Sequence, residues 1–244
     1  MRFLWPILLV LALAGCVSSG DQKNIQEASR INTQLGIDYA RNGQLALAQE
    51  KLLKALEQDS NNALAHAALA FVYQQLADST AAERHYRRAL SLNPGDSQVR
   101  NNFGVFLCGR GKREEGETYL LQASRDKRYA TPEVALTNAG VCYRGKEADK
   151  AEGYFREALR ANPAFPDALS EMTALCVQRQ DYICARAFVQ RFEQAGQMTP
   201  KMLWLAAQAE AGLGDRETSR KYQIRLKREF PDSEEAAMML KTYQ

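Results

Sequence analysis

The chain has 244 residues, of which 45% are hydrophobic and 25% charged, and its net charge is +3. This composition is typical of a globular protein with enough apolar residues to bury a core. So small a charge argues against nucleic acid as a partner, because proteins that bind it carry a marked basic excess. His66 and His85 are the only histidines, which disfavours a histidine-rich metal site or a histidine-based catalytic centre.

The first residues predict a secretory signal peptide. Arg2 precedes an apolar run at residues 3–13, which is too short to span a bilayer as a helix. The Leu-Ala-Gly-Cys sequence that ends at Cys16 resembles the lipobox of bacterial lipoproteins. This resemblance implies cleavage before Cys16 and acylation of that residue with several chains, including palmitate. The alternative is an ordinary signal peptide with a chance cysteine at its end.

The lipobox also predicts where the protein resides. Residues 1–15 are expected to be removed, and residues 16–28 to form the lipidated cysteine and a short polar tether. Several acyl chains on one residue anchor a protein stably to a membrane. No Asp follows Cys16, which by similarity to bacterial lipoproteins favours the periplasmic face of the outer membrane.

Residues 29–232 contain a pattern that recurs at an offset of 34. The first half of each copy has a small residue followed by a larger one, as in Gly36 with Tyr39, Ala70 with Tyr73, Gly104 with Leu107 and Gly140 with Tyr143. The second half places small residues around a large one, as in Ala48-Leu52-Ala55, Ala82-Tyr86-Ala89 and Ala151-Phe155-Ala158. Offsets of three and four put these residues on one helical face. A unit this short must stack on its neighbours to bury a core.

The pattern resembles the tetratricopeptide repeat, present here in about six copies. The resemblance implies an all-α fold, a right-handed superhelical solenoid of helix-turn-helix repeats. Pro94, Pro163 and Pro231 are expected to end second helices. Residues 233–244 are expected to form a capping helix over the open end of the stack.

Four cysteines remain after Cys16, an even number in a protein sent to an oxidising compartment. Cys108 and Cys142 lie at nearly equivalent places in the first helices of neighbouring repeats, which predicts a disulfide between them. Cys176 and Cys184 lie across the turn within one repeat, which predicts a second disulfide. The alternative is four free buried thiols. The cysteine spacings do not suggest a metal site.

A binding groove is predicted on the first helices, which line the inner face of such a stack. In tetratricopeptide domains that hold peptides, the ninth place of the repeat points into the groove. Apolar residues occupy this place or lie beside it: Ile37, Ala40, Leu64, Ala67, Phe71, Val105 and Val141. Such a strip on a free surface suggests a partner, although helix packing is an alternative reason for it. Asn101 and Asn138 are expected either to bond a peptide backbone or to satisfy neighbouring helices.

No catalytic motif appears, and neither a cofactor, a metal nor a small-molecule substrate is predicted. The chain is therefore not expected to be an enzyme. A late basic run comprises Arg216, Arg220, Lys221, Arg225, Lys227 and Arg228. Two glutamates interrupt this run, and its spacing is typical of a solvated helix face.

Two cysteine-bearing segments carry a more specific resemblance. Residues 101–108 read Asn-Asn-Phe-Gly-Val-Phe-Leu-Cys, and residues 135–142 read Ala-Leu-Thr-Asn-Ala-Gly-Val-Cys. They are similar to the type IV pilus biogenesis/stability lipoproteins of the PilF/PilW kind. This resemblance implies a pilotin, an outer-membrane lipoprotein that binds the secretin subunit and promotes its localisation and multimerisation. The alternatives are a lipoprotein scaffold of the β-barrel insertion machinery and a regulator of cell-wall enzymes.

Overall fold

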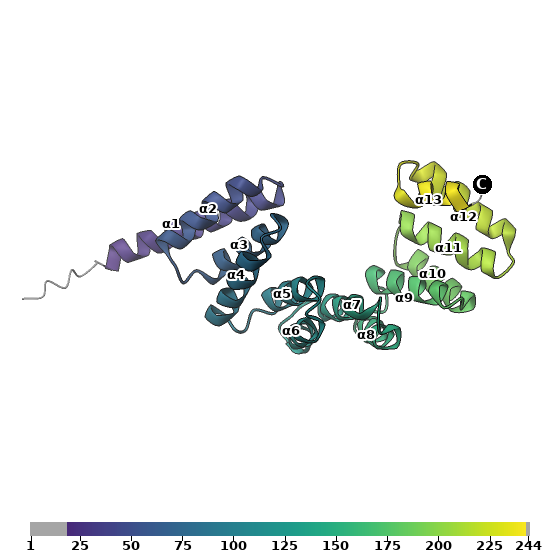
Figure 1. Ribbon diagram of the computed structural model, residues 1–244, viewed down its shortest axis with the longest axis horizontal. Coiled ribbons are helices and arrows are strands. Elements are labelled where there is room, and N and C mark those ends of the chain that lie inside the picture. Colours follow the sequence, from purple (N-terminus) through teal and green to yellow (C-terminus); the bar gives the residue numbers. More distant parts are fainter. Residues whose placement is uncertain (1–18, 243–244) are drawn as a thin grey trace, which may run out of the picture. The chain divides into compact units, whose positions relative to one another are not determined.

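The computed structural model describes residues 19–242, and over this range it contains thirteen helices and no strand (Figure 1). The signal peptide predicted at residues 1–15 and the lipidation site predicted at Cys16 lie outside the described residues. The chain falls into two compact units, which divide between Pro94 and Gly95. None of the described helices is both long enough and apolar enough to cross a membrane.

Unit 1 is built from two antiparallel helix pairs. Its helices are α1 (Ser19–Arg41), α2 (Leu45–Gln58), α3 (Ala63–Gln75) and α4 (Ser79–Leu92). A buried cluster that includes Leu52 and Leu69 joins α2 to α3. Close packing within the first pair requires Gly36, because a Cβ atom there would lie 2.5 Å from Cγ of Leu52. The small residue of the repeat therefore allows the two helices of a pair to meet.

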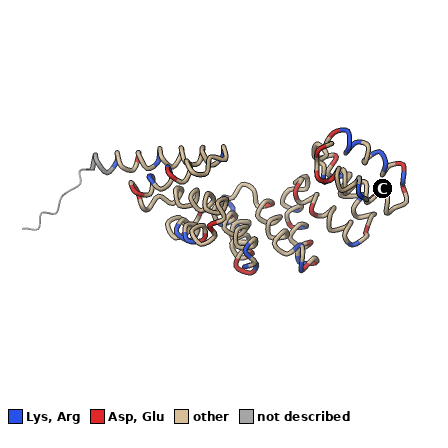
Figure 2. The backbone as a smooth tube through the Cα atoms, turned by 45° about the horizontal axis from the view of Figure 1, so that its top comes forward, with Lys and Arg blue, Asp and Glu red and all other residues tan. Residues whose placement is uncertain are grey.

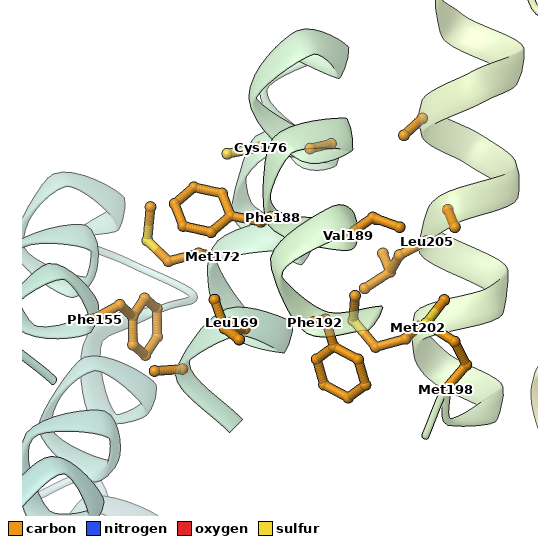
Figure 3. Close-up of a cluster of buried hydrophobic side chains, with 14 of the residues drawn as sticks. Phe155, Leu169, Met172, Cys176, Phe188, Val189, Phe192, Met198, Met202 and Leu205 are labelled. Carbon is orange, nitrogen blue, oxygen red and sulfur yellow. The ribbon is translucent and has the colours of Figure 1, made fainter. Parts of the chain in front are cut away.

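Unit 2 continues the same plan with four helix pairs and a final helix. Its helices are α5 (Ser97–Gly109), α6 (Arg113–Arg125), α7 (Pro132–Tyr143), α8 (Ala148–Ala161), α9 (Pro166–Gln178), α10 (Tyr182–Ala195), α11 (Pro200–Gly212), α12 (Arg216–Glu229) and α13 (Glu234–Thr242). A continuous core extends from α7 to α13, and Figure 3 shows the part of it that lies around Phe155, Met172 and Met202. Phe155, Met172 and Met202 are buried in this core and come from α8, α9 and α11. Stacking thus supplies the core that one pair could not bury.

The helices begin and end where local chemistry requires. Carboxylates of Asp78, Asp96 and Asp215 each accept a hydrogen bond from a backbone N–H in the first turn of the following helix. Such caps satisfy donors that have no partner inside the helix. Helices α4 and α8 end two residues before Pro94 and Pro163, as the sequence predicts.

The ends of the repeat domain differ in part from the prediction. The segment predicted as a tether, residues 16–28, is helical from Ser19 onward and belongs to α1. Polar composition did not distinguish a solvated helix from an extended tether. The predicted capping helix is α13, in which Ala236 and Met239 are buried against the core. The single domain predicted over residues 29–232 is divided at Pro94 into the two units.

Candidate partner-binding site

Helix α3 carries exposed apolar side chains in unit 1. Leu64 and Phe71 have exposed fractions of 55% and 40%, and Ala67 between them is half-buried. These residues share one helical face, because they are spaced by three and four. Ile37 and Ala40 on α1 are half-buried. Packing of the helices therefore does not cover the apolar face of α3.

Unit 2 also exposes aliphatic residues on its first helices. Val105 on α5 and Val141 on α7 are 39% and 40% exposed, whereas their neighbours Phe103 and Ala139 are fully buried. Helix packing, the alternative reason for an apolar residue at these positions, therefore buries Val105 and Val141 only in part. Val105 and Val141 remain available to a partner.

The two predicted groove asparagines are bonded to each other. The Asn138 amide donates to the Asn101 carbonyl oxygen over 2.9 Å, which joins α7 to α5. The Asn101 amide in turn donates to Asn102 over 3.3 Å, and Asn101 is buried. The bond from Asn138 to Asn101 links neighbouring helices, which is one of the two roles predicted, whereas the bond from Asn101 to Asn102 lies within α5. Asn138 is half-buried and also lines a cavity.

This cavity, of about 350 Å³, opens on the first helices of unit 2. Asn138 and Val141 of α7 line it together with Ser170 and Glu171 of α9 and Lys201 of α11. The contributions of α9 and α11 were not predicted from the sequence. The register of the repeat contained the signal, since Glu171 follows Asn138 by 33 residues and occupies the equivalent place.

Charge balance in the cavity centres on Glu171, which is 8% exposed. Its carboxylate pairs with Arg144 at 2.6 Å and with Lys201 at 2.7 Å. One nearly buried acid thus connects α9 to α11 and to the turn that follows α7. A buried carboxylate is costly unless it is paired and hydrogen-bonded, so these two cations compensate it.

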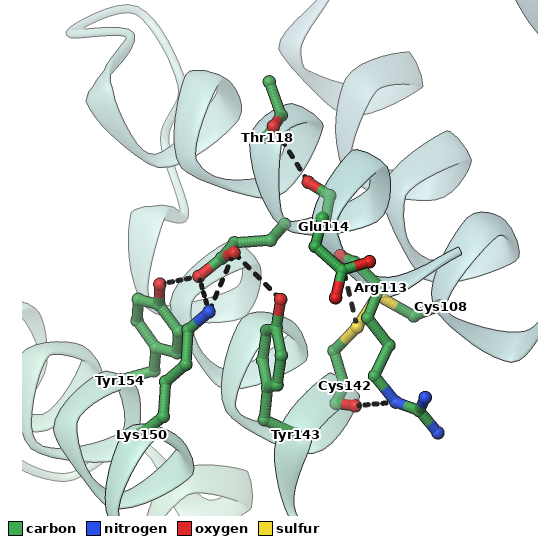
Figure 4. A network of polar contacts seen from close by, with 9 residues as sticks. Cys108, Arg113, Glu114, Thr118, Cys142, Tyr143, Lys150 and Tyr154 are labelled. Atoms are coloured by element: carbon green, nitrogen blue, oxygen red, sulfur yellow. Dashed lines mark hydrogen bonds and ion pairs between the residues drawn. A yellow bond between two sulfur atoms is a disulfide. The ribbon is translucent and has the colours of Figure 1, made fainter. Parts of the chain in front are cut away.

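The four described cysteines lie in two close pairs. Cys108 on α5 and Cys142 on α7 are joined, with their Cα atoms 5.3 Å apart (Figure 4). Cys176 and Cys184 are joined across the turn between α9 and α10, with Cα atoms 5.8 Å apart. Both separations suit a disulfide. The carbonyl oxygen of Cys142 also accepts a hydrogen bond from Nε of Arg113.

The two histidines form a pair inside unit 1. Their Nδ1 atoms are 2.9 Å apart, and Nε2 of His66 lies 3.1 Å from the carbonyl oxygen of Ser60. A carbonyl only accepts, so His66 carries its proton on Nε2 and accepts from His85 at Nδ1. Burial lowers the pKa of His85 to about 4, aided by the charges of His66 and Arg84. Within residues 19–242, no cluster of three or more potential metal ligands accompanies the pair.

Comparison with known proteins identifies the class of repeat and two related proteins. The family model of the tetratricopeptide repeat matches residues 30–164, which agrees with the stacked helix pairs. The type IV pilus assembly protein PilF of Pseudomonas aeruginosa is 36% identical over 240 residues, covering 96% of this chain and 95% of its own. An uncharacterised protein of Haemophilus influenzae is 33% identical over 57% of this chain and 78% of its own.

Solved structures agree with these relatives. A crystal structure of PilW, described as a widely conserved type IV pilus biogenesis factor, is 31% identical with a TM-score of 0.76 and covers 87% of this chain and 98% of its own. A structure of Pseudomonas aeruginosa PilF is 33% identical with a TM-score of 0.75 and covers 90% and 99%. The chain therefore belongs to the tetratricopeptide repeat family, within the group that contains the type IV pilus proteins PilF and PilW.

Proposed function

We propose that the protein is a pilotin for type IV pilus biogenesis. Acyl chains on Cys16 anchor it to the periplasmic face of the outer membrane, and its first helices bind a segment of the secretin subunit. Binding promotes the localisation and multimerisation of the secretin. The exposed apolar face of α3, with Leu64 and Phe71, is the observation that carries this proposal. The type IV pilus roles of the related proteins PilF and PilW support it.

The apolar side chains supply the binding energy in this proposal. Covering about 400 Å² of apolar surface contributes about 10 kcal/mol before the costs of association are subtracted. Those costs, from lost translation, rotation and side-chain freedom, remove a large part of it. A few exposed side chains are therefore sufficient for a specific but reversible complex with an amphipathic segment.

The first test is a pull-down of the acylated protein from its native envelope in mild detergent, with mass spectrometry of the captured proteins and of the Cys16 peptide. Secretin together with an acylated Cys16 is the expected result. Components of the β-barrel insertion machinery or cell-wall enzymes, without secretin, would contradict the pilotin proposal. An unmodified Cys16 would contradict the anchor alone.

A pair of double variants tests the binding face. Phe71→Glu with Val105→Glu should abolish capture of the secretin while the helical spectrum stays unchanged. Leu53→Glu with Ile183→Glu is the control, since Leu53 and Ile183 are also exposed but lie on the second helices α2 and α10. The control should retain capture. Equal capture by both double variants would refute the role of the first helices.

A further inference from the structure

Positive charge is concentrated on one helix of unit 2. Helix α12 has six Lys and Arg residues and two Glu residues, a net charge of +4, whereas the whole chain has +3. The rest of the chain therefore has a net charge of −1. Figure 2 shows the basic positions in blue along this segment near the C-terminus. The excess positive charge of the protein thus lies on α12.

Half of the α12 cations take part in ion pairs, in which Arg225 and Arg228 share Glu229 and Arg225 also lies 4.0 Å from Glu193 of α10. Lys221 pairs with Glu217 at 2.7 Å, and Arg225 and Arg228 both pair with Glu229, at 3.1 and 2.8 Å. The other three form no ion pair with any described residue: Arg216, Arg220 and Lys227. All three are exposed, so their charges are available to a ligand.

The three unpaired cations share a helical face with an exposed apolar residue. Arg216, Arg220 and Lys227 are spaced by four and seven, which places them along one side of α12. Ile224, 56% exposed, lies among them. The buried residues Ser219 and Leu226, seven apart, face the core instead. The outer face of α12 therefore carries three unpaired cations with Ile224 at its edge, next to the Glu217 carboxylate that pairs with Lys221.

We propose that this outer face of α12, formed by Arg216, Arg220, Ile224 and Lys227, binds the surface of a bilayer that contains anionic phospholipids. The cations spread along a helix of about 16 Å over eleven residues and do not converge on a pocket, which suits a layer of headgroups. Ile224 enters the boundary of the acyl chains, while the long Arg and Lys stems keep their charges among the phosphates. Nucleic acid or a purely acidic polypeptide would neutralise the cations but leave Ile224 in water.

Vesicle binding tests the inference independently of acylation and of secretin. The sample is the chain from residue 16 onward with Cys16→Ser, which retains every described residue. It is sedimented with vesicles of about one-third phosphatidylglycerol in phosphatidylcholine, and with phosphatidylcholine alone. We expect binding only to the anionic vesicles, with loss at about 0.5 M salt because the charges are then screened.

Matched variants locate the surface. Each cation near an anionic membrane contributes about fivefold to partitioning, so Arg216→Gln, Arg220→Gln and Lys227→Gln together should weaken binding about a hundredfold. Ile224→Asn alone should weaken it about tenfold, since apolar burial is lost. The control removes three exposed and unpaired cations elsewhere in unit 2, through Arg125→Gln, Lys127→Gln and Lys146→Gln.

Three results would overturn the inference. One is the absence of binding to anionic vesicles at low salt. Another is an equal loss in the α12 and control triple variants, which would indicate a diffuse effect of net charge. The third is binding to polyglutamate or DNA without binding to vesicles, which would assign the face to a different class of partner.

Discussion

Acidification is expected to destabilise unit 1 through its histidine pair. Neutral His85 donates to His66 and stacks on Tyr73, whose ring centroid is 5.4 Å away. Protonation of His85 places a charge in the core beside Arg84, and protonation of His66 as well turns two N–H groups toward each other. Arg88 also lowers the pKa of His66, after burial, whereas Asp59 and the Ser60 carbonyl raise it.

The direction and size of the change in stability follow from the difference in the pKa of His85 between the folded and unfolded states. An unfolded histidine has a pKa of about 6.5, and folding lowers that of His85 to about 4. The unfolded state therefore binds the proton more readily, and the stability that is present above pH 6.5 is lost as the pH falls toward 4. A fall in pKa from about 6.5 to about 4 corresponds to about 3 kcal/mol of unfolding free energy.

Amide hydrogen exchange measures this loss of stability separately for each helix. Protection of the α3 and α4 amides, corrected for the intrinsic pH dependence of exchange, should fall between pH 7 and 4.5 more than that of α11. The variant His66→Asn with His85→Asn should remove this extra dependence, while both proteins share the titration of their carboxylates. An NMR titration of the His85 ring gives an independent measurement. A pKa near 6.5, or the same pH dependence in both proteins, would refute the reasoning.

Three further predictions concern packing, crosslinking and capping. Gly140→Ala should cost about 1–3 kcal/mol in chemical denaturation, because its Cβ would lie 2.3 Å from the Phe155 ring; unchanged stability would contradict this close contact. Cys108→Ser with Cys142→Ser should cost about 4 kcal/mol by the chain-entropy model, and free thiols in the wild type, detected by intact mass, would exclude the crosslink. Asp78→Ala should lower the melting temperature, at a cost of about 1 kcal/mol, whereas Asp78→Asn should restore most of it.

The repeat carried most of the information about the fold. A position that must admit a neighbouring helix selects a small residue in the first four copies, as Gly36 and Gly140 do beside Leu52 and Phe155, whereas Thr173 stands at this position in the fifth. This selection is local, so it can be read from residue sizes at a fixed period. The division into two units after Pro94 could not be predicted in this way. The repeat pattern continues across it, and prolines also follow the second helices of other copies, at Pro163 and Pro231.

The candidate site was less predictable because its residues are not selected for packing. The sequence shows an asparagine at position 138 but not its partner. Its amide bonds to Asn101 because α5 and α7 lie close enough together, and that distance cannot be obtained from the sequence. The place equivalent to Asn138 in the next copy is Glu171, whose role depends on Arg144 from the turn after α7 and on Lys201 from α11. The period therefore predicts that Asn138 and Glu171 occupy equivalent places, whereas the chemistry at each place depends on side chains brought there by separate copies.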